Sequence, residues 1–178
     1  KYSLGGTFAS DGGFMAVNKS WSAWWREFLG QSPDGTRKAL EILSQRYVEA
    51  SQHVARFTQH AERMQYPHFR DRLLTIATEK AKHGEWIAEK IKLLGGRLPD
   101  VPPFTVTEKT SWQYLSEDLN EEQQRSVELI EQARSLRAEL PAVAEVLERI
   151  YEDSRRHRET LREMLMRSDP QSHLSYLS

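Results

Sequence analysis

The chain contains no cysteine among its 178 residues. This absence excludes disulfide bonds, thiolate catalysis, and zinc or iron–sulfur sites that depend on cysteine. Neither sign of charge is in excess, because 25 Lys and Arg residues stand against 26 Asp and Glu residues. A chain so balanced has no general attraction for nucleic acid or an anionic membrane. No apolar run approaches the roughly 18 residues of a membrane-spanning helix. We therefore expect no nucleic-acid partner and no membrane partner.

The composition is typical of a surface-charged helical protein, with 29% charged and 38% hydrophobic residues. The length suits one folded domain. We expect an N-terminal arm at 1–35, a helical domain at 36–168 and a tail at 169–178. The compartment is unknown: no signal segment is visible, which favours the cytoplasm, but the chain starts at Lys1 rather than Met, so trimming of an earlier segment stays open.

The arm at 1–35 begins with a Gly-rich stretch that reads as loop and continues into NKSWSAWWREFL at 18–29. This second stretch predicts a short helix with an aromatic face. The face consists of Trp21, Trp24, Trp25 and Phe28. Spacing of three and four is typical of a buried helical stripe. We therefore expect these residues to form an interface with the helical domain or with a neighbouring subunit.

The rest of the chain predicts four long helices, at about 36–65, 68–94, 111–139 and 141–167. In each of them apolar residues alternate at spacings of three and four, as in helices that pack nearly antiparallel. The connection at 97–110, RLPDVPPFTVTEKT, is too long and too rich in proline for a tight turn. It suits a crossover that runs the length of the molecule, which defines a bundle with one crossover.

Polar residues interrupt the apolar pattern in one zone of every helix. They are Tyr47 on the first helix, Lys80 and His83 on the second, Glu122 and Ser126 on the third, and Ser154 and His157 on the fourth. The second and fourth helices also echo each other here, EKAKHGE against DSRRHRE. A pseudo-two-fold repeat would bring these two segments together.

These motifs, in this order, resemble the ferritin-like superfamily, the group of bacterioferritin and rubrerythrin. The likeness lies in EKAKHGEWIAEKIKLLGGRLP, YLSEDLNEE and IYEDSRRHRETL and covers residues 36–168. It implies an all-α, ferritin-like four-helix bundle of up-down-down-up topology, with one long crossover between the second and third helices. It also implies a homodimer, because dimers are common in the family.

In that family, the first and third helices each supply a Glu, and the second and fourth each supply Glu-x-x-His, to a di-iron centre. The resemblance places His83, Glu122 and His157 on three of the six ligand positions. It places Tyr47, Lys80 and Ser154 where the other three carboxylates belong. Two iron ions need several hard oxygen ligands to balance their charge. An ammonium group repels them, so we expect a degenerate site without catalytic function.

Three alternatives stay open for these residues. The first is a buried polar network in which Lys80 pairs with Glu122, completed by Tyr47, His83, Ser154 and His157, with no cofactor. In the second, His83, Glu122 and His157 bind one iron or manganese ion in a metal-dependent oxidoreductase. In the third, the bundle core holds a small organic anion with Lys80 as its charge partner. The first predicts a structural or interaction protein. We expect His53 and His60, beside the seam of the first helix, to face solvent or a subunit contact.

Overall fold

The computed structural model describes residues 33–105 and 107–168. It contains four long helices, α2 (Pro33–Arg63), α3 (Pro67–Leu93), α4 (Ser111–Leu136) and α5 (Pro141–Arg167). No strand occurs in these two ranges. The prediction of an all-α four-helix bundle is therefore confirmed. The aromatic helix predicted at 18–29 lies outside the described residues.

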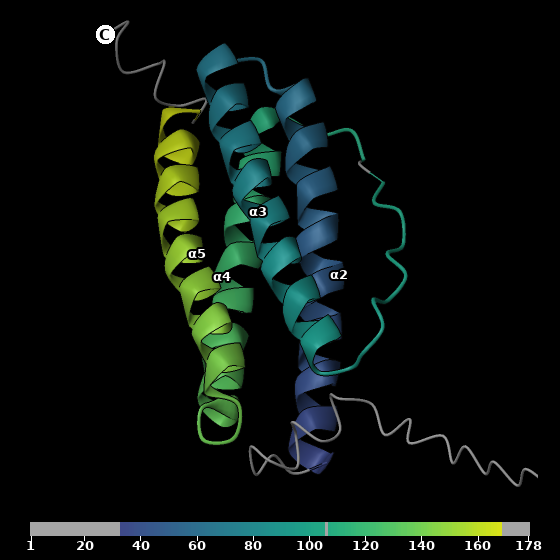
Figure 1. Cartoon of the computed structure of the whole chain (residues 1–178). Coiled ribbons are helices and arrows are strands. Elements are labelled where there is room, and N and C mark those ends of the chain that lie inside the picture. The colour runs from purple at the N-terminus through teal and green to yellow at the C-terminus, as the bar shows by residue number, and fades with distance from the viewer. Residues whose placement is uncertain (1–32, 106, 169–178) are drawn as a thin grey trace, which may run out of the picture.

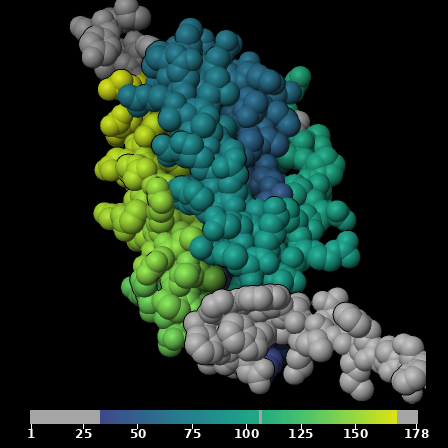
Figure 2. Space-filling view, in the orientation of Figure 1, coloured from purple at the N-terminus to yellow at the C-terminus, as the bar shows by residue number. Residues whose placement is uncertain are grey.

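The helices form two antiparallel hairpins, α2 with α3 and α4 with α5 (Figure 1). After α3 ends, the chain runs back along α2 to the opposite end of the bundle, where α4 begins (Figure 1). This crossover makes α3 and α4 run in the same direction and produces the predicted up-down-down-up topology. The space-filling view shows α3 between α2 and α5 on one face of the molecule (Figure 2).

Local signals in the sequence set the ends of the helices. Pro67 and Pro141 stand at the first turns of α3 and α5, where the absence of a proline N–H removes no intrahelical bond. Thr110 and Gln113 form a capping box at the start of α4. At the end of α3, Gly95 has a φ of 78°, a left-handed conformation that glycine adopts without a steric cost.

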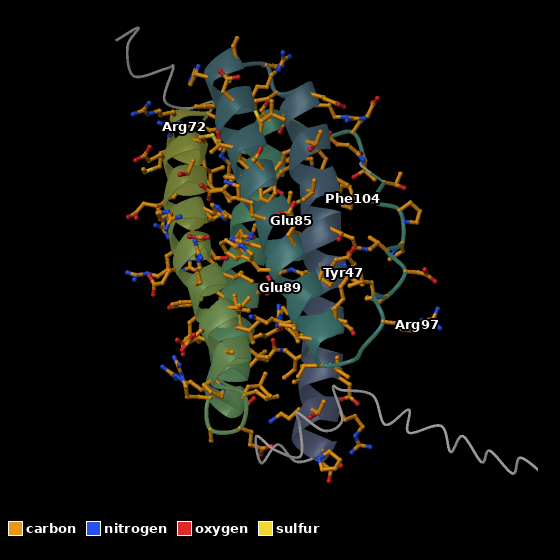
Figure 3. All side chains as sticks on the ribbon, in the orientation of Figure 1. Tyr47, Arg72, Glu85, Glu89, Arg97 and Phe104 are labelled. Carbon is orange, nitrogen blue, oxygen red and sulfur yellow. The ribbon has the colours of Figure 1, made fainter. Side chains whose placement is uncertain are left out.

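The crossover is held against α2 and α4 at a few points. The Gln59 side chain donates a hydrogen bond to the Phe104 carbonyl (3.4 Å), and the Tyr114 hydroxyl donates one to the Thr107 carbonyl (3.0 Å). The Phe104 side chain, labelled in Figure 3, lies near the Arg56 guanidinium and the His60 ring of α2.

The interior consists of two apolar clusters, one toward each end of the bundle. The first contains Leu43, Ala50, Ile87, Leu129 and Ile150, and the second contains Phe57, Ala77, Leu119 and Leu161. On every helix a polar stretch separates the two clusters. We call these residues the polar layer; they are His53, Lys80, His83, Glu122, Ser126, Ser154 and His157, all buried.

Candidate functional site

The polar layer centres on an ion pair between α3 and α4. The Lys80 ammonium donates a hydrogen bond to Glu122 Oε1 at 2.6 Å, and the two side chains are only 5% and 3% exposed. Burial alone would raise the pKa of Glu122. The charge of Lys80, with contributions from His53 and His157, outweighs burial and lowers this pKa to about 2. Glu122 is therefore an anion at neutral pH, although its side chain is buried.

Two of the three histidines of the polar layer are paired crosswise between α3 and α5. His83 Nε2 lies 2.8 Å from Asp153 Oδ2, and His157 Nε2 lies 2.6 Å from Glu79 Oε2. An ionised carboxylate only accepts hydrogen bonds, so each Nε2 carries the proton and donates it. Each helix thus supplies one histidine and one carboxylate, which gives the contact the two-fold character expected from the repeated motif.

Burial keeps both of these imidazole rings neutral. It is the largest cause that lowers the pKa of His83, to about 4, and the charge of Lys80 lowers it further. The pKa of His157 is lowered by the same two causes in the same order. A neutral ring with its proton on Nε2 has a lone pair on Nδ1. In both residues Nδ1 is buried and has no hydrogen-bond partner within the protein.

His53 is a third buried histidine of the polar layer, and the prediction that it faces solvent is wrong. It is 6% exposed. Its Nδ1 lies 3.7 Å from Glu122 Oε1, and its Nε2 lies 3.7 Å from Glu121 Oε2. The sequence did carry a signal, because His53 stands three residues after Ala50 and four before Phe57, both of which are buried.

The prediction for His60 is also wrong, because it is 2% exposed. His60 Nδ1 lies 2.8 Å from Oδ2 of the buried Asp118 carboxylate, and the other carboxylate oxygen forms an ion pair with Arg56, whose Nε lies 2.8 Å away. The ring stacks on Tyr114 with centroids 4.3 Å apart. These charged and stacked contacts join α2 to the first turns of α4, next to the polar layer on the side of the second apolar cluster.

Tyr47 and Ser154 lie at the edges of the polar layer. Tyr47 is half-buried, packs on the first apolar cluster and lines a surface groove between α2 and α3. Ser154 is buried and lines a small, partly open pocket of about 40 Å³ together with His53, Lys80, His83 and Glu122. That volume suits a few water molecules. An organic anion in the core, the third alternative from the sequence, would have to displace side chains.

The donor set of the polar layer does not fit two iron ions. Among the described residues of the layer, Glu122 is the one carboxylate at the centre, and the Lys80 ammonium lies 2.6 Å from it. The carboxylates of Glu79 and Asp153 are engaged by the Nε2 atoms of the histidines. Within the described ranges, no three His, Asp or Glu side chains are grouped so that they could hold a metal ion.

None of the helices in the described ranges is long and apolar enough to cross a membrane.

The architecture and the arrangement of its four helices are those of a ferritin-like bundle, as the sequence motifs predict. No family model matches the chain, and no curated protein matches it. Among solved structures, the chain is similar to the bacterioferritin-related protein from Bacteroides fragilis, which is described as a dodecameric thioferritin. The TM-score is 0.74 at 14% identity, over 87% of this chain and 99% of that one.

A second similar structure is a protein from Xanthomonas campestris pv. campestris, with a TM-score of 0.68 and 16% identity. The match covers 75% of this chain and 91% of that one. At such identities the two likenesses establish the fold, and the chemistry of the site must be argued from the residues of this chain.

Proposed function

We propose that the protein is a ferritin-like protein with a structural or interaction role, in which a buried polar network replaces the di-iron centre of the fold. The observation that carries this proposal is the hydrogen-bonded ion pair of Lys80 and Glu122, 2.6 Å long and enclosed by all four helices. The ammonium balances the charge of the one central carboxylate, which is the electrostatic task of a metal cation in a ferritin-like site.

The remaining polar atoms support the same proposal. His53 and His157 place ring nitrogens 3.7 and 3.9 Å from the two oxygens of Glu122. They are neutral because burial lowers the pKa of each ring. Two apolar clusters enclose the polar layer on either side. Such a network specifies how α2–α3 docks on α4–α5, since a displaced hairpin would leave a buried charge without its partner.

The interaction role would be exercised through assembly with copies of the same chain. The dodecameric state of the Bacteroides fragilis protein supports oligomerisation. We propose a homodimer that uses the aromatic arm, Trp21, Trp24, Trp25 and Phe28, or the outer face of α2. Light scattering on the full chain should give the mass of a dimer or larger assembly, and Trp24→Ala with Trp25→Ala should lower it. A monomeric parent chain would contradict the homodimer.

Elemental analysis tests the absence of a resident metal. The protein is purified without chelator from cells supplied with iron, manganese and zinc. The proposal predicts far less than one metal ion per chain. Near-stoichiometric iron or manganese that disappears in His157→Ala would overturn it.

A second candidate is a metal-dependent oxidoreductase with one iron or manganese ion at His83, Glu122 and His157. One observation favours it: both histidines donate Nε2–H to a carboxylate and keep a buried, unpaired Nδ1. Histidines that bind metals have this arrangement, because the carboxylate fixes the tautomer and the ring orientation. Metal-dependent oxygen consumption that is lost in His83→Ala and His157→Ala would establish this candidate.

A further inference from the structure

A surface groove of about 330 Å³ lies between α2 and α3. Two of the side chains that line it, Tyr47 on α2 and Glu85 on α3, are labelled in Figure 3. Lys80 also lines it, but its ammonium is bonded to Glu122 in the polar layer. The other lining residues are uncharged and mostly small; they are Ser51, Val54, Ala81, Gly84 and Ala88. The groove is therefore mainly apolar, and its volume is in the range of pockets that hold an aromatic ring, roughly 300–1,000 Å³.

The groove lies a short way along α2 from the start of that helix. Tyr47 and Ser51, two of its lining residues on α2, stand 14 and 18 residues after Pro33. At a rise of about 1.5 Å per residue, they lie roughly 21 and 27 Å from the start of the helix. A segment that precedes Pro33 must span this distance in order to reach the groove.

The sequence before Pro33 has the length to reach it. The connection from Phe28 to Pro33 can extend over about 17 Å. If the helix predicted at 18–29 turned back along α2 from there, Trp24 would lie up to about 23 Å from Pro33 and Trp21 up to about 28 Å. These two tryptophans therefore reach the level of the groove.

The aromatic face of 18–29 needs an apolar surface to cover it. A tryptophan side chain that packs against protein buries about 150–250 Å². The groove offers such a surface, and the half-buried ring of Tyr47 in its wall can make an edge-to-face or offset contact with an indole. Small side chains such as Ala81 and Ala88 leave room for the indole beside this ring.

The charges of the two segments are complementary. Glu85 is exposed at the groove, and within the described ranges it takes part in no ion pair. Arg26 directly follows Trp25 in the sequence. In a segment that runs antiparallel to α2, Arg26 would lie near the level of Tyr47, where its long side chain could cross the apolar groove and place the guanidinium beside the Glu85 carboxylate.

We propose that the groove between α2 and α3 is the docking surface of the chain's own N-terminal arm, with Trp21 and Trp24 seated in the groove. The inference goes beyond the proposed function, because it depends neither on the polar layer nor on a second copy of the chain. An arm in this groove and the outer face of α2 form one continuous surface, on which the proposed homodimer would assemble.

The absence of cysteine allows the docking to be measured with a single label. Lys82 is exposed on α3 beside the groove, and Lys82→Cys is labelled with bimane, whose emission tryptophan quenches on close approach. The same labelled chain is prepared with Trp21, Trp24 and Trp25 replaced by Phe. Because burial of two indoles favours the docked state, emission with the parent arm should be less than half of that with the Phe arm. Val127→Cys, exposed on α4, is the control and should emit equally with both arms.

A substitution in the groove tests where the arm docks. Ala88→Glu places a carboxylate on the groove wall, where an indole would have to bury it, and should restore most of the lost emission. Thr78→Glu, exposed on the same helix, is the matched control and should leave the quenching unchanged. If Ala88→Glu does not fold, Ala81→Glu at the exposed edge of the groove serves instead.

Equal emission from the two arms at Lys82 would overturn the docking. Quenching that survives Ala88→Glu, or that is as strong at Val127, would overturn the assignment to this groove. Quenching that disappears on dilution would show that a second copy supplies the arm and would overturn docking within one chain. None of these results affects the proposed role of the polar layer, which fails on a different observation, a stoichiometric metal in the parent chain as purified.

Discussion

Replacement of Lys80 or Glu122 by methionine tests the buried ion pair by its energetics. The pKa of Glu122 falls from 4.5 to about 2 in the folded protein. That difference corresponds to roughly 3 kcal/mol of preferential stabilisation of the anion at neutral pH. Removal of one partner also leaves the other charge buried and unpaired, which costs about 3–5 kcal/mol in comparable pairs. We therefore expect Lys80→Met and Glu122→Met each to lower the free energy of unfolding by about 3–5 kcal/mol.

The double variant is the decisive member of the series. Two methionines leave no unpaired charge, and their flexible side chains fill irregular space in a core. The free energy of unfolding of the double variant should therefore lie within about 1–2 kcal/mol of that of the parent. This loss is far smaller than the sum of the losses in the two single variants. Denaturant unfolding followed by circular dichroism at neutral pH measures all four proteins, and Lys82→Met is the surface control. Single effects below about 1 kcal/mol, as for an exposed pair, or a double effect equal to their sum, would show that the two charges do not form a buried, mutually dependent pair.

Three further predictions concern the surroundings of this pair. First, since the pKa of His83 is lowered from 6.5 to about 4, its contribution to stability is complete above pH 6.5 and is lost as pH falls toward 4. Unfolding titrations should show a loss of roughly 3 kcal/mol from His83 across this window, and His83→Gln should flatten the slope. Second, Asp118→Asn removes the charge between Arg56 and His60 and should cost about 3 kcal/mol, whereas Glu117→Gln on the exposed side of α4 should cost less than about 1 kcal/mol; equal losses would contradict the burial argument. Third, an added Cβ at Gly96 would lie 2.5 Å from Leu40 Cδ2, but one at Gly84 would have its nearest neighbour 3.9 Å away. Gly96→Ala should therefore destabilise by about 1–3 kcal/mol and Gly84→Ala, within α3, should stabilise by up to about 1 kcal/mol in the same unfolding assay.

The helices and their order could be predicted from the sequence because the signals are local or periodic. Proline and glycine mark the helix ends, apolar residues recur at three and four, and the connection at 97–110 is too long for a tight turn. The predicted helices differ from the observed ones by only a few residues at each end. The position of the polar layer could also be predicted, because the apolar pattern of each helix is interrupted by polar residues at a similar level along the bundle.

The partners within the polar layer could not be predicted in the same way. The sequence shows Glu79 four residues before His83 and Asp153 four before His157. In the folded protein each carboxylate instead bonds the histidine of the opposite helix. Which carboxylate bonds which histidine depends on how α3 and α5 pack against each other. The spacing of residues within one helix does not determine that packing. His53 was missed for a related reason. The predicted seam of this helix ran through Tyr47, Ala50 and Val54, and the structure buries Ala50 and His53 whereas Tyr47 and Val54 are half-buried.

Anomalous diffraction from crystals of the parent chain, grown as purified and without added metal, distinguishes a Lys80–Glu122 ion pair from a bound metal ion. Data collected above the iron edge would reveal iron or manganese at full occupancy beside Glu122. We expect no anomalous peak between Glu122, His83 and His157, and continuous density for Lys80 up to hydrogen-bond distance of Glu122. A strong peak among these three side chains, with Lys80 turned away, would contradict it.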